Sequence, residues 1–218
     1  MLVIFDCDGV LVDTEPLSNR CFSEALRGEG LDWDVAETMR RLMGRSMRSC
    51  IEIVEAELGR KVPGDFVDRL QERTFACFDE EGVRAVSGVI TALDALERAG
   101  LRTCVASSGD HGKMRITLGS AGLWDRFDGR IFSSTQVARG KPAPDLFLFA
   151  AERMGMPPAD CVVIEDSSAG AQAARAAHMR AYGYVGAPHT DRAGLVEAGA
   201  TMFDDMRGLP TLLGVVAA

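Results

Sequence analysis

Short runs of apolar residues recur along this chain, and most of them are apolar throughout rather than alternating with polar residues. Such runs are typical of strands that are buried on both faces of a parallel sheet. They predict the following strands, the last of them from the weakest pattern: Leu2–Phe5, Thr103–Ala106, Arg130–Phe132, Cys161–Ile164, Ala181–Tyr184 and Thr201–Phe203.

Between these runs, the spacing of apolar residues follows the period of an α-helix. One helix is expected over residues 88–99, and another is expected to begin at Asp145 as its cap. An Ala-rich helix over residues 169–177 is expected to be capped by Asp166 or Ser167. This alternation predicts an α/β fold, a doubly wound Rossmann-like parallel sheet that binds ligands at the carboxyl ends of its strands.

Residues from about 15 to 80 follow a different pattern, with helical periodicity and almost no β-branched runs. This predicts a small all-helical cap, residues 14–83, inserted after the first strand of a core formed by residues 1–13 and 84–218. The chain crosses between the two parts twice, and two adjacent linkers form a natural hinge. We therefore expect the insert to act as a lid.

The composition narrows the class of protein. The 218 residues are 47% hydrophobic and carry a formal net charge of −8, which favours a globular protein without a nucleic-acid partner. No apolar run approaches the roughly 18 residues of a membrane span, and Asp6 comes too early for a secretory signal, so a cytoplasmic protein without a membrane partner is expected.

The six cysteines are scattered singly and are expected to be reduced and buried. The sequence carries no signal for oligomeric state, and a monomer is favoured.

Acidic residues follow two of the predicted strands. Asp6 and Asp8 come after the first strand, at a spacing that directs both carboxylates to one side of an extended chain, and Gly9 permits a sharp turn. Glu165 and Asp166 come after a later strand. Taken alone, either pair also suits a turn or a helix cap.

Two other loops carry groups suited to a phosphate. Ser107, Ser108 and Gly109 offer hydroxyl and backbone N–H donors, and Lys141 lies in a rigid loop between glycine and proline. Taken alone, Ser107 suits a turn and Lys141 a solvated loop. The crowded carboxylates would repel one another unless a hard cation joined them, so the combination predicts a Mg²⁺ site that also accepts a substrate phosphate.

These residues fall into four ordered segments, which are Asp6-Cys7-Asp8-Gly9-Val10, Ser107, Lys141 within Gly-Lys-Pro-Ala-Pro-Asp, and Glu165-Asp166-Ser167-Ser168-Ala169-Gly170. In type, order and position they resemble the four motifs of the haloacid dehalogenase superfamily, over nearly the whole chain. The Val-Leu-Val-Asp-Thr-Glu continuation and the helical insert are similar to the branch with a small helical cap, which includes sugar phosphatases and β-phosphoglucomutase.

The resemblance implies a role for each residue. Asp6 would be the nucleophile that forms an aspartyl-phosphate, and Asp8 would protonate the leaving oxygen and then take a proton from the attacking water. Ser107 and Lys141 would hold the phosphoryl oxygens and offset charge in the transition state. The resemblance also implies Mg²⁺ bound by the Asp6 carboxylate, the Asp8 backbone carbonyl, Asp166 and, nearby or through water, Glu165, with Cys7, Gly9 and Ser108 as further phosphate contacts.

Particular residues narrow the reaction that the resemblance implies. Asp8 favours phosphoryl transfer, because a halide leaving group needs no proton. A phosphonatase is expected to have a cap lysine that forms a Schiff base, but the insert contains only Lys61, in a loop-like stretch. Ser18 stands where the related mutases have a histidine, which favours water as the phosphoryl acceptor.

The leading hypothesis is a Mg²⁺-dependent phosphatase of small phosphate monoesters such as a phosphosugar or a sugar-acid phosphate. A β-phosphoglucomutase-type phosphomutase is the alternative within the family. A receiver-type signalling domain is a remote alternative, because its phosphoacceptor would lie in mid-chain and it would have no cap. In the insert, Arg45 resembles a substrate-binding residue of this branch, with Arg48 and Arg73 as weaker candidates, and each also suits a solvated helix face.

Overall fold

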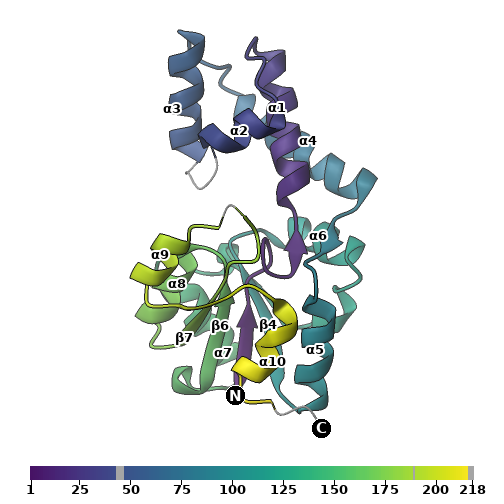
Figure 1. Ribbon diagram of the computed structural model, residues 1–218, viewed down its shortest axis with the longest axis vertical. Coiled ribbons are helices and arrows are strands. Elements are labelled where there is room, and N and C mark those ends of the chain that lie inside the picture. Colours follow the sequence, from purple (N-terminus) through teal and green to yellow (C-terminus); the bar gives the residue numbers. More distant parts are fainter. Residues whose placement is uncertain (43–46, 189, 216–218) are drawn as a thin grey trace.

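The centre of the protein is a parallel sheet of six strands, seen in a computed structural model that describes residues 1–42, 47–188 and 190–215 (Figure 1). The strand order is β5-β4-β1-β6-β7-β8, and a separate antiparallel ribbon pairs β2 with β3. The strands are β1 Leu2–Phe5, β2 Val12–Asp13, β3 Arg84–Ala85, β4 Arg102–Ser107, β5 Ile131–Ser133, β6 Cys161–Glu165, β7 Arg180–Tyr184 and β8 Thr201–Phe203.

Helices connect the strands and cover both faces of the sheet (Figure 1). The helices are α1 Glu15–Gly28, α2 Val35–Leu42, α3 Met47–Leu58, α4 Phe66–Glu81, α5 Val89–Arg98, α6 His111–Ser120, α7 Asp145–Arg153, α8 Ser168–Ala176, α9 Arg192–Glu197 and α10 Leu209–Leu212. Short 3₁₀ turns occupy Asp125–Phe127, Ser134–Gln136, Pro158–Asp160 and Met206–Gly208.

Strand β1 shows why its apolar run is continuous. Val3 and Phe5 belong to a core cluster that includes side chains of α5, α6 and α10, whereas Leu2 and Ile4 belong to a second cluster with α7, α8 and α9. Alternate residues of a strand point to opposite faces, so a strand covered by helices on both sides needs apolar residues at every position. All four residues of β1 are fully buried.

The structure confirms the α/β fold class, and each predicted strand is present with bounds that differ by one residue at most at either end. The side chain of Ser167 caps α8 by accepting a hydrogen bond from the backbone N–H of Gly170, as expected. The prediction that Asp145 caps its helix is wrong by one position. Pro144 occupies the cap of α7, and the carboxylate of Asp145 instead accepts hydrogen bonds from Arg139.

The helices α1 to α4 form a group of their own beyond the carboxyl ends of the strands (Figure 1). Their apolar side chains, including Leu26, Val54 and Leu70, make a third core cluster that is separate from the two of the sheet. The thiol of Cys21 on α1 donates to the sulfur of Cys77 on α4 at 2.9 Å, and all six cysteines are buried and free of disulfides. We call α1 to α4 the cap helices. The prediction that the cap is a separate domain with boundaries at residues 14 and 83 stays a prediction.

The chain leaves the sheet region and returns to it at one place. Val12 pairs with Ala85, Asp13 pairs with Arg84, and the backbone N–H of Val86 donates to the carbonyl of Leu11 at 3.0 Å. The two crossings are therefore one hydrogen-bonded ribbon. Within the described part of the chain, no helix has both the length and the hydrophobicity to cross a membrane.

Candidate active site

Three neighbouring strands bring the predicted motifs to one edge of the sheet. Because β1 lies between β4 and β6, the residue after β1, Asp6, lies between the last residues of β4 and β6, Ser107 and Glu165. The backbone N–H of Asp6 extends the pairing by donating to the carbonyl of Ile164 at 2.9 Å. The sheet topology thus juxtaposes residues that are more than 150 positions apart in the sequence.

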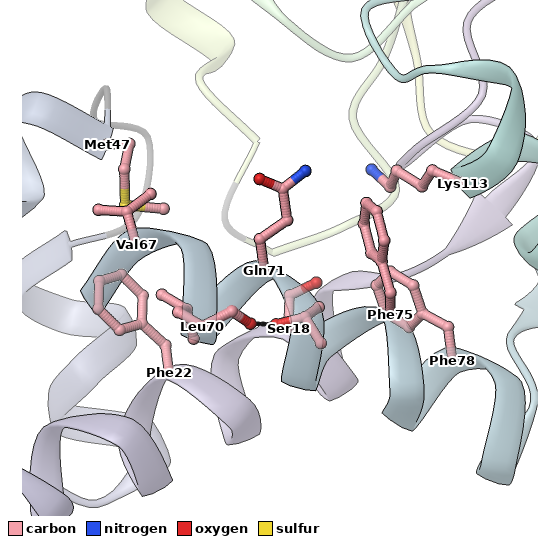
Figure 2. Close-up of a pocket in the computed structure, with 10 residues that line it drawn as sticks. Ser18, Phe22, Met47, Val67, Leu70, Gln71, Phe75, Phe78 and Lys113 are labelled. Carbon is pink, nitrogen blue, oxygen red and sulfur yellow. Dashed lines mark hydrogen bonds between the residues drawn. The ribbon is translucent and has the colours of Figure 1, made fainter. Parts of the chain in front are cut away.

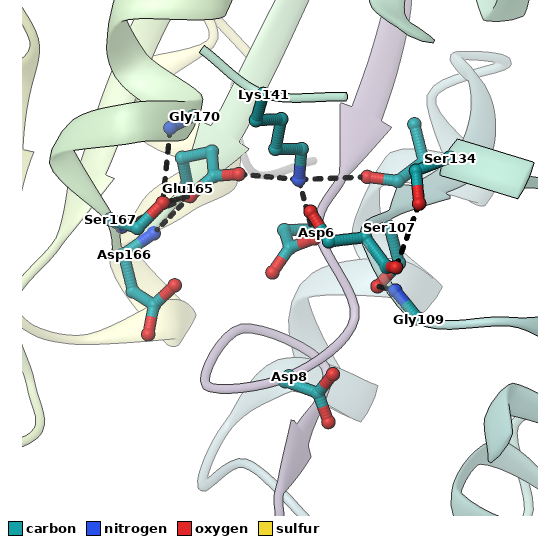
Figure 3. Close-up of polar contacts among 12 residues, drawn as sticks. Asp6, Asp8, Ser107, Gly109, Ser134, Lys141, Glu165, Asp166, Ser167 and Gly170 are labelled. Carbon is teal, nitrogen blue, oxygen red and sulfur yellow. Dashed lines mark hydrogen bonds and ion pairs between the residues drawn. The ribbon is translucent and has the colours of Figure 1, made fainter. Parts of the chain in front are cut away.

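Lys141 reaches into this edge and joins two of the acidic residues (Figure 3). Its Nζ lies 2.7 Å from Oδ1 of Asp6 and 2.6 Å from Oε1 of Glu165, and it also donates to the carbonyl of Ala106 at 3.1 Å. All three of its N–H donors therefore have acceptors. Burial opposes the charge of Lys141, but the Asp6 and Glu165 carboxylates outweigh this, so the pKa of Lys141 is raised.

Glu165 is held from both sides of its carboxylate. While Oε1 accepts from Lys141, Oε2 accepts from the backbone N–H groups of Asp166 and Ser167 and from the Ser167 hydroxyl at 2.8 Å. A Cβ at Gly170 would overlap this carboxylate, which explains why glycine stands there in the first turn of α8. The fixed donors leave Glu165 less free than Asp6 or Asp166 to bind a further partner.

The carboxylate oxygens of Asp6, Glu165 and Asp166 lie within 4.8 Å of one another. Burial raises the pKa of Asp6 to about 7, with Glu165 and Asp8 adding to the rise and Lys141 opposing it. Burial and the neighbouring carboxylates of Glu165 and Asp6 also raise the pKa of Asp166. One lysine does not compensate three neighbouring acids, two of them buried, and an oxygen-only donor set of this kind fits Mg²⁺.

The loop after β1 makes room for this cluster. Gly9 has a φ of 74°, and a Cβ at this position would overlap the carboxylate of Asp166. The carbonyl of Cys7 accepts from the N–H groups of Leu11 and Val12, while its side chain is buried in the sheet core. Only glycine combines this left-handed backbone with the close approach of an aspartate.

Asp8 lies apart from the other acidic residues, farther along the same loop (Figure 3). Its carboxylate accepts from the Thr14 hydroxyl at 3.0 Å and from Nζ of Lys113 at 2.6 Å. The expectation that all four acidic side chains crowd together is therefore wrong for Asp8, whose carboxylate is not in the three-residue cluster. A role for its backbone carbonyl in metal binding stays a prediction.

Lys113 is a site residue that the sequence analysis missed, since the only cation it assigned to this region is Lys141. It lies in the first turn of α6, which Asp110 caps by accepting from the Lys113 backbone N–H. A cation is electrostatically unfavourable at a helix N-terminus. A lysine at this position therefore indicates that its ammonium group pairs with an acidic residue outside the helix. Burial opposes the charge of Lys113, but Asp8 outweighs this, so the pKa of Lys113 is raised.

The loop after β4 is held by its own hydroxyl groups. The buried Ser107 accepts from the backbone N–H of Gly109 at 3.1 Å, and Ser133 donates to the carbonyl of Gly109 at 2.8 Å. The Ser108 side chain is exposed, and its carbonyl accepts from the Ser134 hydroxyl. Ser107 thus lies beside Asp6 in a loop that these hydrogen bonds hold.

A cavity of about 220 Å³ opens between the cap helices and Lys113 (Figure 2). Its lining is mostly apolar, and its polar members are Ser18, Gln71, Thr74 and Lys113. The apolar members are Phe22, Met47, Val67, Leu70, Phe75 and Phe78. We call this space the cap pocket, and it lies on the Asp8 side of the site because Lys113 belongs to both.

The arginines proposed from the cap sequence do not line this pocket as far as the structure describes them. Arg48 forms an exposed ion pair with Glu52, and Arg73 forms one with Glu80, which is the solvated helix face weighed from the sequence. Arg45 lies outside the described residues, and its contact with a substrate stays a prediction.

Known proteins resemble this chain along most of its length. The sequence profile of the haloacid dehalogenase-like hydrolases matches residues 1–178. The chain is 29% identical to 6-phosphogluconate phosphatase of Escherichia coli (strain K12), over 96% of this chain and 93% of that protein. It is 35% identical to the fructose-1-phosphate phosphatase YqaB of the same organism, over 82% and 93%. A HAD family hydrolase from Deinococcus radiodurans R1, solved with bound phosphate and sodium, is 33% identical and superposes with a TM-score of 0.84 over 98% of this chain and 94% of that one.

Proposed function

Because the chain belongs to the haloacid dehalogenase-like hydrolases, we propose that it hydrolyses a small phosphorylated metabolite in a Mg²⁺-dependent reaction through an aspartyl-phosphate on Asp6. The chain is a phosphoric monoester hydrolase, as are its named phosphatase relatives. The proposal for its substrate is a phosphosugar or a sugar-acid phosphate. The free, buried cysteines suit a reducing compartment, and we place the reaction in the cytoplasm.

The observation that carries the proposal is the position of Asp6. Its carboxylate ends the central strand, contacts the buried Lys141 at 2.7 Å and shares its surroundings with Glu165 and Asp166. In the first step, an oxygen of Asp6 attacks the phosphorus, the ester P–O bond breaks, and Asp8 gives its proton to the leaving oxygen. In the second step, Asp8 takes a proton from water, whose oxygen attacks the phosphorus and returns Asp6 as a carboxylate.

Asp6, Asp166 and the Asp8 carbonyl are the groups that would hold Mg²⁺, with Glu165 beside them. When bound, the ion would supply positive charge that allows an anionic phosphate to approach an anionic nucleophile. Lys141 and the Ser107 hydroxyl would hold the phosphoryl oxygens, and the N–H groups of the glycine-containing loop after Asp6 would add further donors.

The second candidate, phosphoryl transfer back to a sugar, needs a group that protects the phosphoenzyme from water. Ser18 lines the cap pocket at the position where the related mutases have a histidine. A serine hydroxyl has no titratable nitrogen with which to position Asp8. This favours hydrolysis.

The test is ³¹P NMR of the protein with Mg²⁺ and a panel of phosphate monoesters, including β-glucose 1-phosphate with a trace of glucose 1,6-bisphosphate. A phosphatase releases inorganic phosphate from one ester far faster than from the others. Conversion of glucose 1-phosphate to glucose 6-phosphate without release of phosphate would instead identify a mutase, and full activity in EDTA would contradict the metal requirement.

A further inference from the structure

Lys113 has two neighbours of different kinds. On one side its Nζ donates to Oδ2 of Asp8 at 2.6 Å, and on the other its side chain lines the cap pocket. Its side chain is 22% exposed. Figure 2 shows the ammonium of Lys113 and the amide of Gln71 pointing toward the same region of the pocket.

The pocket around Lys113 offers no other described charge. The other lining residues are apolar or neutral, with Ser18, Gln71 and Thr74 as the polar ones. Neutral amide and hydroxyl groups suit the hydroxyls of a polyol chain, whereas Lys113 can offset a full negative charge. An anionic group that enters this pocket therefore has Lys113 as its partner among the described residues.

The pairing with Asp8 leaves capacity for a second acceptor. An ammonium group has three N–H donors, and among the described residues the Nζ of Lys113 has one acceptor, the carboxylate of Asp8. Lys141 demonstrates the geometry in this same protein, because its Nζ contacts the carboxylates of Asp6 and Glu165 at 2.7 and 2.6 Å. A lysine that joins two anions is thus an arrangement that this fold already uses.

We propose that Lys113 is a specificity residue that binds a carboxylate or a second phosphate on the leaving group, so that the preferred substrates are phosphate monoesters with an additional anionic group. The inference rests on the proposed phosphatase function. It assigns Lys113 a direct contact with the substrate in addition to its contact with Asp8. A role limited to holding Asp8 would affect all substrates alike.

The experiment compares two esters that differ at one carbon. D-Gluconate 6-phosphate carries a terminal carboxylate where D-glucitol 6-phosphate carries a hydroxymethyl group, and a hexitol 1,6-bisphosphate tests whether a second phosphate serves as well. Phosphate release with Mg²⁺ is measured for the wild-type protein and for Lys113→Met, Lys113→Arg and Lys61→Met. Lys61 is a matched control, because this cap lysine pairs with Glu55 while its side chain is 87% exposed.

We expect the wild-type protein to prefer at least one anionic ester, and we expect Lys113→Met to reduce that preference in kcat/KM by roughly 10- to 100-fold, the range for loss of a hydrogen bond to a charged group. Lys113→Arg should retain most of the preference, since it keeps the charge, and Lys61→Met should behave as the wild type. The ester whose advantage collapses in Lys113→Met identifies whether the anion is a carboxylate or a phosphate.

Two results would overturn the inference while leaving the phosphatase function intact. One is a wild-type protein that hydrolyses the neutral and anionic esters equally well. The other is a Lys113→Met variant whose kcat/KM falls by the same factor for all of them, which would limit Lys113 to positioning Asp8. A wild-type protein that hydrolyses no phosphate monoester of the wider panel would overturn the proposed function itself.

Discussion

Two lysines contact the acidic residues of the loop after β1, and their surroundings differ. The side chain of Lys141 is 5% exposed, and those of its partners Asp6 and Glu165 are 10% and 1% exposed. The side chains of Lys113 and Asp8 are 22% and 29% exposed, and that of Lys113 lines the cap pocket. Lys141, Asp6 and Glu165 lie at the carboxyl ends of the strands. Lys113 and Asp8 lie on the side of the site that faces the cap helices.

The difference separates two tasks. A buried lysine held by Asp6, Glu165 and a backbone carbonyl has a fixed position, which suits a group that places the same positive charge beside the phosphoryl group in every reaction. A lysine with remaining donors at a cavity can contact the part of the substrate that varies from one ester to another. Charge interactions are also stronger in the buried group, because water screens them less. Four experiments test this contrast.

Replacement of the residue at the centre of the buried group has the largest expected effect. Asp6→Asn should lower kcat by at least ~10³-fold, because a neutral amide cannot form the aspartyl-phosphate. The melting temperature should change by only a few degrees, since the side chain keeps its size. Asp32→Asn, at an exposed residue of the cap, controls for preparation. Retention of more than a few per cent of the wild-type rate by Asp6→Asn would contradict its role as nucleophile.

Removal of the buried cation should lower both activity and stability. Lys141→Met leaves buried acidic groups without their partner, which costs about 3 kcal/mol of unfolding free energy. The deficit should be largest near pH 9 and shrink toward pH 5, because Asp6, with its pKa of about 7, is protonated there and no longer needs a cation. Denaturant unfolding at the two pH values measures this, and an equal deficit at both would show that packing alone is lost.

Addition of Mg²⁺ should stabilise the protein in a pH-dependent way. The pKa of Asp6 rises from 3.8 to about 7 on folding, so the metal-free protein loses stability as the pH rises through this interval. Mg²⁺ compensates the carboxylates that form, and it should raise the melting temperature by about 5 °C at pH 8 but much less at pH 5. Thermal unfolding in MgCl₂ and in EDTA checks this. An equal rise in melting temperature for the Asp6→Asn variant would show that Mg²⁺ binds at another site.

Removal of the partly exposed lysine should have the smallest effect on stability. Lys113→Met breaks an ion pair that water partly screens, so we expect a change in unfolding free energy below about 1 kcal/mol at pH 8. The measurement is the same denaturant unfolding as for Lys141→Met. A loss as large as that of Lys141→Met would remove the contrast between the two groups.

The sequence was sufficient for the parts of the site that depend on strand ends. Asp6, Ser107 and Glu165 could be predicted as neighbours because parallel strands end at one edge, whatever the exact packing of the helices. The contact between Asp8 and Lys113 could not, because it depends on how the first turn of α6 meets the loop after β1. The error at Asp145 has a similar origin, since its ion pair with Arg139 depends on the conformation of the loop that precedes α7.

The ribbon of β2 and β3 bears on how such a protein can change over evolution. The segment that contains the cap helices lies between Asp13 and Arg84, two residues that pair across this ribbon. The intervening segment is therefore a closed side branch, whose length and sequence leave the register of the sheet unaltered. A different set of helices grafted between these two residues would inherit the same acidic centre while presenting it with another binding surface, so that the reaction and the choice of substrate can diverge separately.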